Sequence, residues 1–223
     1  MSETWLLLGA PGVGKSTFSH MLRERCTNLR QFSVRLFTAC LLAGDSELGN
    51  YLREHEIVKP KVHMPDEVVE QVFAEFLKTV SDSHFLLIEG YPINHTQFLG
   101  MMRQLEGVGR GIDGVLILTD TYERIRSRVE NRRICPHCEQ ESGGGVPIPA
   151  GAVVCPFCAR PLIRRAEDDP EFFQIRYQMF LEEKERICRW FPHEIIQETD
   201  AFSDSCSVLL KEWVRKGNAA VHE

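Results

Sequence analysis

The segment TWLLLGAPGVGKST, Thr4–Thr17, carries the strongest indication of a fold in this sequence. It opens with a short apolar run, Thr4–Leu8, which is typical of a buried β-strand. The letters from Gly9 to Ser16 fit the pattern G-x-x-x-x-G-K-S/T, whose glycines let successive backbone N–H groups point at one anion. A helical pattern begins at Lys15 and would add the positive end of a helix at the same point. Strand, loop and helix together predict a phosphate-binding loop, although the letters alone also fit an ordinary glycine-rich turn.

A triphosphate in such a loop is held by defined groups. We expect Lys15 to reach the β- and γ-phosphates and the hydroxyl of Ser16 to ligate Mg²⁺. ATP and Mg²⁺ are therefore the expected cofactors. The residues expected to line the nucleotide are Gly9, Ala10, Pro11, Gly12, Val13, Gly14, Lys15, Ser16 and Thr17.

Apolar runs typical of buried strands alternate with helical patterns along the rest of the chain. The helix expected from Pro65 shows one apolar face that includes Val69, Val72 and Phe76. Alternation of this kind predicts an α/β fold with a parallel sheet covered by helices on both faces. Further strands are expected near 31–37, 84–89, 112–118 and 194–197, and further helices at 15–25, 122–133, 169–191 and 203–215.

Composition and charge narrow the class of protein. The formal net charge of −6 and the pI of about 5.8 argue against a general nucleic-acid binder, since such domains are usually basic. A local positive cleft for a small anion remains possible. No apolar run approaches the roughly 20 residues of a membrane span, and no basic flank precedes the first apolar run. We therefore expect a soluble cytoplasmic protein that does not interact with a membrane.

Four of the eight cysteines fall within one short segment. Cys135-x2-Cys138 is followed by 16 residues and then by Cys155-x2-Cys158, a spacing expected of a four-thiolate zinc site. Because four protein ligands leave no position for water, the predicted Zn²⁺ is structural. His137 is an alternative ligand, but the repeated C-P-x-C pattern favours Cys138. Chance cysteines or two disulfides are the other explanation, and a reducing compartment makes disulfides unfavourable.

Arginines cluster on both sides of the cysteine segment. Arg128 and Arg132 are four residues apart and would share one helix face, and Arg165 and Arg176 follow the segment. A guanidinium is always charged and bidentate, which suits a phosphoryl group in transfer. Any single arginine is equally compatible with a solvated charge or an ion pair. We favour that interpretation for Arg124, Arg126 and Arg164.

Taken together, these motifs resemble the adenylate kinase family of nucleoside monophosphate kinases over roughly Thr4–Arg215. The resemblance implies a P-loop kinase fold with a five-stranded parallel sheet and a zinc-knuckle lid insert. It also implies one nucleotide kinase domain over 1–223, a monophosphate-binding arm at 31–64 and a four-cysteine zinc lid at 134–164. The stretches that carry it are GAPGVGKST, SELG, PDEVV, LLIEGYP, SRVENRR and RAED.

The resemblance assigns roles to individual residues. Glu89 replaces an Asp that holds Mg²⁺ through water, and Gln97 falls where the family has a Gln that contacts adenine. The lid would close over ATP, exclude water and bring arginines onto the phosphates. The catalytic residues that the resemblance implies are Lys15, Arg128, Arg132, Arg165 and Arg176.

The acceptor half departs from the family pattern. Two arginines that bind the monophosphate in the family correspond here to Ala39 and Ile93. Each loss removes a charge-assisted contact worth about 1.5–3 kcal/mol. The basic residues that could substitute are Arg35, Arg53, Lys59 and Lys61.

The function expected from these motifs is transfer of the ATP γ-phosphoryl group to a nucleoside monophosphate, with AMP as the first candidate. Small-molecule nucleotides are the expected partners, nucleic acid is not, and we expect a monomer. Three alternatives stay open. They are a kinase for a different acceptor, a nucleotide-binding relative without transfer activity, and a knuckle that binds nucleic acid while the phosphate loop powers a conformational cycle. The acidic pI weighs against the last of these.

Overall fold

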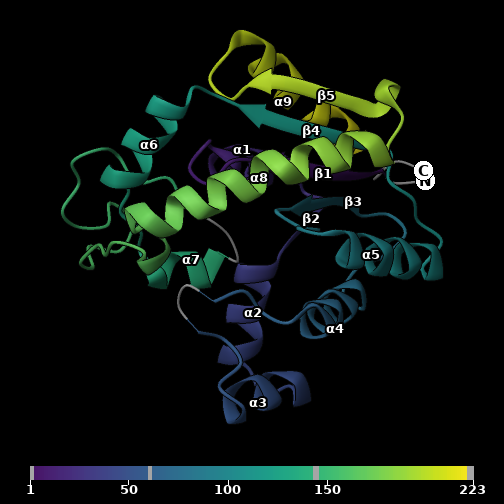
Figure 1. Cartoon of the computed structure of the whole chain (residues 1–223), viewed down its shortest axis with the longest axis horizontal. Helices are drawn as coiled ribbons and strands as arrows, with labels where there is room; N and C mark the ends of the chain where they lie inside the picture. The colour runs from purple at the N-terminus through teal and green to yellow at the C-terminus, as the bar shows by residue number, and fades with distance from the viewer. Residues whose placement is uncertain (1–2, 60–61, 143–145, 220–223) are drawn as a thin grey trace.

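The computed structural model describes residues 3–59, 62–142 and 146–219. Within these ranges, five parallel strands form one sheet (Figure 1). The predicted α/β fold with a five-stranded parallel sheet is confirmed. The strands are β1 (Thr4–Gly9), β2 (Leu29–Ser33), β3 (Phe85–Glu89), β4 (Gly114–Thr119) and β5 (Ile196–Asp200), and they lie in the order β2-β3-β1-β4-β5.

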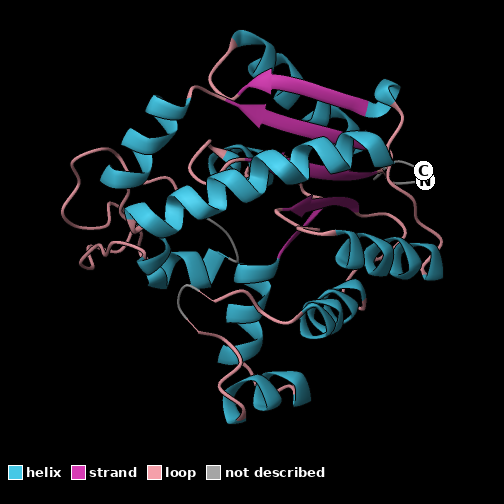
Figure 2. Cartoon of the chain, in the orientation of Figure 1, coloured by secondary structure: helices cyan, strands magenta, loops and turns pink. Residues whose placement is uncertain are grey.

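Helices surround this sheet, as Figure 2 shows. Two short 3₁₀ helices, Ala166–Asp168 and His193–Ile195, precede the longest helix and the last strand. Within the described ranges, no helix combines the length and apolar character needed to cross a bilayer. The α-helices are α1 (Lys15–Arg23), α2 (Val34–Ala43), α3 (Glu47–Glu54), α4 (Asp66–Leu77), α5 (His95–Gly107), α6 (Tyr122–Asn131), α7 (Pro136–Ser142), α8 (Pro170–Trp190) and α9 (Asp204–Ala219).

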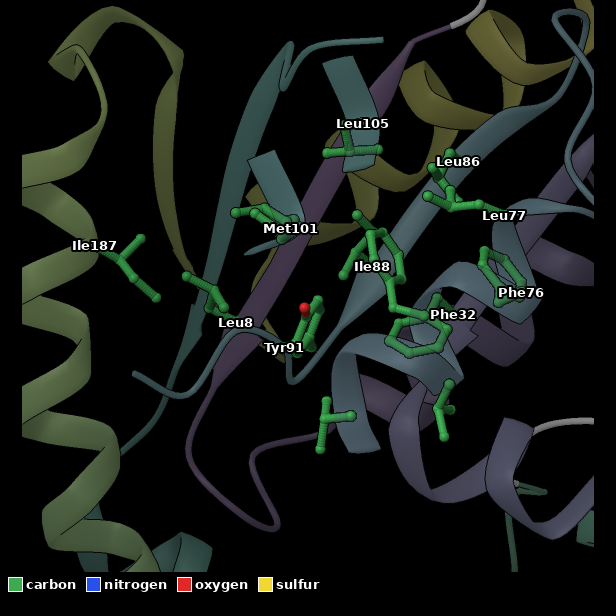
Figure 3. Close-up of a cluster of buried hydrophobic side chains, with 14 of the residues drawn as sticks. Leu8, Phe32, Phe76, Leu77, Leu86, Ile88, Tyr91, Met101, Leu105 and Ile187 are labelled. Atoms are coloured by element: carbon green, nitrogen blue, oxygen red, sulfur yellow. The ribbon is translucent and has the colours of Figure 1, made fainter. Parts of the chain in front are cut away.

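The central strand β1 is buried on both faces. Leu6 and Leu8 belong to one buried cluster, whereas Trp5 and Leu7 belong to the other. Figure 3 shows the first cluster, in which Leu8 lies together with Ile88 of β3. Because neighbouring side chains of a strand point to opposite faces, both sides of β1 must be apolar. This is why the first apolar run has no polar alternation.

The strand predicted near 31–37 is wrong in its second half. β2 ends at Ser33, which pairs with Glu89, the last residue of β3. Val34 therefore lies beyond the edge of the sheet, where no neighbouring strand can pair with it, and the chain turns into α2. The apolar run continues past Ser33, the last residue that pairs with β3, so its length alone predicts a longer strand than the sheet contains.

Two further helices, α3 and α5, were not predicted. The hydroxyl of Ser46 accepts a hydrogen bond from the N–H of Gly49 at 3.1 Å and caps α3. The side chain of Asn94 accepts one from the N–H of Gln97 at 2.9 Å and caps α5. Both caps are local signals that the sequence contains. The last strand begins later than predicted, because residues 193–195 form a 3₁₀ turn instead.

The cysteine segment contains a helix, α7, that was not predicted from the sequence. α7 begins at Pro136, directly after Cys135, includes Cys138 and extends to Ser142. Two isolated antiparallel bridges, Ile134 to Ile163 and Val154 to Pro161, hold the remaining described part together. Part of the glycine run inside this segment, residues 143–145, lies outside the described residues.

The carboxyl ends of the parallel strands meet at one edge of the sheet. β2 and β3 lie on one side of β1, and β4 and β5 lie on the other. In doubly wound folds, ligands bind in the crevice at such a change of direction. In Figure 1, α2 and α3 extend away from the sheet, and α7 lies near α2. The fold thus brings the segment after β1, the arm and the cysteine segment to one region.

Candidate active site

The phosphate-binding loop connects β1 to α1. Gly12 has a φ of 86°, and a Cβ at this position would lie 2.3 Å from the side chain of Val129. Only glycine meets both conditions without strain. The Nζ of Lys15 folds back over the loop and donates hydrogen bonds to the carbonyl oxygens of Gly9 at 2.6 Å and Ala10 at 3.0 Å. The loop is therefore shaped for a close approach of its backbone to an anion.

The charge on Lys15 is destabilised in the absence of an anion. Burial lowers its pKa to about 8, Glu89 opposes the shift, and Arg176 and Arg132 add to it by repulsion. Several cations converge on this lysine and one carboxylate faces it. A polyanion placed here would relieve the repulsion and stabilise the charged amine.

Glu89 lies at the end of β3, beside the loop. Its side chain is buried and accepts hydrogen bonds from Ser16 Oγ at 3.3 Å, Ser19 Oγ at 3.1 Å and Gln31 Nε2 at 2.6 Å. A carboxylate and a hydroxyl are the oxygen ligands that Mg²⁺ prefers, so Glu89 and Ser16 fit that ion. Sequence reasoning missed Ser19 and Gln31. Ser19 lies three residues after Ser16, a spacing that places both on one side of α1.

The loop opens into a cleft with a volume of about 1470 Å³. Lys15, Ser16, Glu89 and Gln97 line it together with the predicted arginines Arg128, Arg132, Arg165 and Arg176. The structure therefore brings these predicted side chains to one cavity, from segments that are far apart in the sequence. The opposite wall belongs to α2 and the segment before α4, and it is lined by Val34, Arg35, Thr38, Ala39, Leu42, Val58, Lys59, Val62, His63 and Met64.

Three of the four predicted arginines are paired with carboxylates in this structure. Arg128 pairs with Asp120, and its guanidinium also lies 4.6 Å from the centre of the Phe202 ring. Arg132 binds both carboxylate oxygens of Asp168, with Nε 2.8 Å from Oδ2. These buried partners fix the direction in which each guanidinium points.

The charged forms of Arg165 and Arg176 are destabilised by burial and by nearby cations. Burial, followed by repulsion from Arg35 and Arg132, lowers the pKa of Arg165 to about 10. Burial and then Arg132 also lower the pKa of Arg176. Arg165 is paired with Glu139, whereas Arg176 forms no hydrogen bond or ion pair with any residue that the structure describes. Such crowding of cations indicates a site for an anion.

The other flanking arginines are bound elsewhere. Arg126 pairs with Glu130 at 2.8 Å on the exposed side of α6, and Arg124 lies 3.5 Å from Asp120. Arg164 donates to the backbone oxygen of Asp168 at 2.7 Å. None of these three lines the cleft within the described residues. Their positions agree with the interpretation of ordinary ion pairs and surface charges.

Gln97 reaches the cleft but its amide is already engaged. Its Oε1 accepts a hydrogen bond from the backbone N–H of Ile93 at 3.0 Å, and its Nε2 donates to Asp66 at 2.7 Å. Asn94 also donates to Asp66, at 3.0 and 3.1 Å. The side chain of Gln97 is buried. A ligand at this place would have to use the second N–H of the amide or rearrange this network.

The four predicted cysteine ligands form a cluster. All four Sγ atoms lie within 4.8 Å of one another, with 3.5 Å between Cys135 and Cys158 and 3.6 Å between Cys138 and Cys155. A tetrahedron with Zn–S bonds of about 2.3 Å has edges of roughly 3.8 Å, so the cluster fits Zn²⁺. All eight cysteine thiols of the chain are unbridged. The cluster includes Cys138 and not His137, which agrees with the predicted ligand set.

The thiols of this cluster differ in acidity: the neighbouring thiols and burial raise the pKa of Cys138, whereas the pKa of Cys155 is lowered. Burial raises the pKa of Cys155, but hydrogen bonds from the backbone of Phe157 and Cys158 outweigh that effect and bring the pKa to about 7. Thiolates are the form that binds zinc. Cys155 is therefore the thiol of this cluster that is closest to its zinc-binding form.

The four basic residues that could replace the missing acceptor arginines differ in whether they are found at the cleft. Arg35 and Lys59 line the cleft. Arg53 does not, since it donates to the backbone oxygens of Leu42 and Gly44 and to Asn50 within the arm. Lys61 lies outside the described residues. Among the described residues of the arm, Arg35 is the arginine that lines the cleft.

Several known proteins similar to this chain are adenylate kinases. The chain is 30% identical to the adenylate kinase of Thermococcus onnurineus over 186 residues, which cover 83% of this chain and 81% of that protein. It is 29% identical to the adenylate kinase of Pseudothermotoga lettingae, over 79% of this chain and 80% of that protein. It is 28% identical to the adenylate kinase of Mycoplasma mycoides subsp. mycoides, over 83% and 85%. No protein-family model matches the chain. The similarity to these enzymes extends over most of the chain and not over a single motif.

Proposed function

This chain belongs to the adenylate kinase family, and from that premise we propose that it transfers the γ-phosphoryl group of ATP to AMP. Membership makes it a nucleoside monophosphate kinase, a nucleotide-binding transferase. The choice of AMP is our proposal. One observation carries it: the phosphate loop and four arginines from three other segments line a single cleft that also reaches the arm.

The loop holds the donor. The backbone N–H groups of Gly9–Ser16 bind the donor phosphates, and Lys15 leaves the carbonyl oxygens of the loop to bind the terminal ones. Burial and, to a smaller extent, nearby arginines lower the pKa of Lys15, and a bound triphosphate stabilises its charged form. Thr17 follows in the first turn of α1 and completes the loop.

Mg²⁺ fits between Ser16 and Glu89, and when bound it neutralises charge on the donor phosphates. The carboxylate of Glu89 is already oriented by Ser19 and Gln31, so it needs little rearrangement to hold an ion directly or through water. Glu89 keeps the charge of the Asp that the family motif implies at this position and has a longer reach.

Four arginines stabilise the transferring group in this proposal. Arg128 and Arg132 come from α6 and its end, Arg176 comes from α8, and Arg165 comes from the end of the cysteine segment. Electrostatic stabilisation and positioning supply most of the catalysis in phosphoryl transfer. Arg176 has the clearest role, since it is half-buried, crowded by cations and without a protein ion pair among the described residues.

Two further segments, the lid and the arm, close around the substrates in this proposal. Residues 134–164 form the lid, which Zn²⁺ folds through Cys135, Cys138, Cys155 and Cys158 because so short a segment has little apolar surface. Residues 31–64 form the arm that receives the monophosphate. An acceptor phosphate that is ionised near neutral pH needs no general base. We propose that the protein acts as a monomer on small-molecule nucleotides within one domain.

An end-point screen tests this proposal. ATP and Mg²⁺ are supplied with AMP, CMP, UMP, GMP or their deoxy forms, and the diphosphate products are quantified. AMP should give ADP at the highest kcat/KM. Product from another monophosphate alone would contradict the choice of AMP but not the reaction class. Binding of ATP without product from any acceptor would favour a relative without transfer activity.

A further inference from the structure

A single buried carboxylate joins the arm to the lid. Glu139 of α7 is 5% exposed and lines the cleft. It accepts a hydrogen bond from Arg35 Nη1 at 2.8 Å and another from Arg165 Nη2 at 2.6 Å. Arg35 stands at the start of α2, 104 residues away in the chain. α7 lies near α2 in Figure 1, which agrees with this pairing.

The site has more positive charge than its own carboxylates neutralise. Burial lowers the pKa of Arg165, and repulsion from Arg35 and Arg132 lowers it further; burial also lowers the pKa of Arg176, with smaller contributions from Arg132 and Arg35. Glu139 carries one negative charge and forms ion pairs with both Arg35 and Arg165. Burying a carboxylate is costly unless it is paired, and the two guanidiniums offset that cost. The arrangement is thus a binding site for one oxyanion, occupied by a side chain.

We infer that Arg35 and Arg165 bind the phosphate of the acceptor, and that Glu139 occupies their site when no acceptor is bound. The inference rests on the proposed function, because it concerns the second substrate of the same cleft. Arg35 then takes the role for which Ala39 and Ile93 carry no charge. Glu139 acts as an internal competitor of the acceptor.

The exchange of one anion for the other is chemically balanced. A monophosphate carries about 1.5–2 negative charges near neutral pH and three terminal oxygens, whereas Glu139 carries one charge and two oxygens. Both arginines keep an anionic partner, so neither guanidinium is left buried and unpaired. The released carboxylate has to turn toward water. The apparent affinity for the acceptor is therefore lower than the intrinsic affinity by the fraction of molecules in which the site is free.

Arg35 suits this role better than the other basic residues of the arm. It is 44% exposed and reaches the cleft, so it can change partners without breaking the fold. Arg53 is committed to backbone oxygens inside the arm. Lys59 lines the cleft, but its ammonium is a point charge without the bidentate geometry of a guanidinium. Arg35 also stands in the first turn of α2, where the helix dipole favours a bound anion.

Two substitutions with opposite expected signs test the inference. Arg35→Ala should raise the KM for AMP by about tenfold or more, with kcat changed by less than about threefold, since a charged contact is lost. Arg30→Ala removes an equally charged but exposed residue of β2 outside the cleft and serves as the control. Glu139→Gln should lower the KM for AMP by about three- to tenfold, because the competing charge is gone while the shape stays. Glu130→Gln, on the exposed side of α6, is its control.

A merely structural role for Glu139 predicts the reverse sign, since loss of an ion pair would loosen the lid and raise KM. Calorimetric titration of AMP alone, and of inorganic phosphate alone, gives the same comparison without transfer. Metal content and melting temperature show whether Glu139→Gln keeps the knuckle; if it does not, Arg35→Ala still decides. Equal effects of Arg35→Ala and Arg30→Ala, or a raised KM for a metal-replete Glu139→Gln protein, would overturn the inference. If the wild-type protein forms no product with any monophosphate, the proposed function fails, and the phosphate titration tests this site by itself.

Discussion

The two ends of the cleft differ in how their residues come together. At the donor end, Lys15 and Ser16 come from one continuous segment. Lys15 contacts carbonyl oxygens of that segment, and Ser16 contacts Glu89 at the end of the neighbouring strand β3. At the acceptor end, the wall is largely apolar, with Val34 and Ala39 facing the cavity. The arginine that lines this wall, Arg35, reaches a residue of the cysteine segment.

In the proposed function, this difference corresponds to two ways of binding phosphate in one cavity. A triphosphate loop needs backbone N–H groups at consecutive positions, so a short continuous segment suffices. A second phosphate can be held by side chains from any element that the fold brings close. The donor end is therefore fixed in a rigid loop, whereas the acceptor end depends on two projecting segments and their mutual position.

Lys15→Ala tests the donor end most directly. We expect transfer to fall by about 10³-fold or more, because the terminal phosphates lose their only loop cation in this segment. The fold and the bound metal should be unchanged, as measured by circular dichroism and metal analysis. Lys211→Ala changes an exposed lysine of α9 and should have full activity. A Lys15→Ala protein with near-normal kcat would remove the basis for the donor assignment.

Cys155→Ser tests whether the metal supports both ends at once. The variant should lose its zinc, and kcat should fall by about 10²-fold, because Arg165 and Glu139 both depend on the knuckle for their positions. Cys40→Ser alters an exposed cysteine outside the cluster and is the matched control. Metal analysis with steady-state kinetics measures both effects. A Cys155→Ser protein that retains stoichiometric metal would refute the four-thiolate site.

Ala39→Arg tests whether the acceptor end is short of charge. Ala39 is half-buried and faces the cleft, so an arginine has room to extend. We expect the KM for AMP to fall by about three- to tenfold with little change in kcat, since one charge-assisted contact is added. Steady-state kinetics with AMP as the varied substrate measures it. Ala39→Gln adds comparable length without charge, and an equal gain from it would show that charge is not what the site lacks.

Glu183→Gln concerns stability and not the rate. Glu183 of α8 lines the cleft, its Oε1 is buried without a hydrogen-bond partner, and burial raises its pKa while Arg186 opposes the shift. At pH 7 its charge therefore disfavours the folded state, and the neutral amide should stabilise the protein by up to about 1 kcal/mol, or about 2–4 °C in Tm.

The pH dependence of this gain has a definite sign. Because the folded-state pKa lies above 4.5, the folded wild-type protein takes up a proton before the unfolded one does. Wild type and Glu183→Gln should thus differ most near neutral pH and converge as the pH falls through the raised pKa toward 4.5. Thermal melts at several pH values measure this. A gap that widens on acidification would contradict the assignment, and Glu182→Gln, an exposed neighbour, provides the control.

Much of the fold followed from local patterns. The apolar run of β1, the glycine pattern after it and the alternation of strands with helices predicted the parallel sheet. The extended β2 prediction failed because pairing ends at Ser33, which no local pattern reveals. The helices α3 and α5 were missed although Ser46 and Asn94 are ordinary caps. In these helices the caps were a clearer signal than hydrophobic spacing.

The linear order of residues was enough to indicate the phosphate loop, the four thiolates and the set of arginines, because each depends on short spacings or on chemistry that few residue types possess. The carboxylates that pair with those arginines are determined by how the helices pack. Arg132 with Asp168, and Glu139 between Arg35 and Arg165, join positions 26 to 104 residues apart. Which carboxylate meets which guanidinium depends on where whole helices lie, and that position follows from the burial of side chains across the entire core.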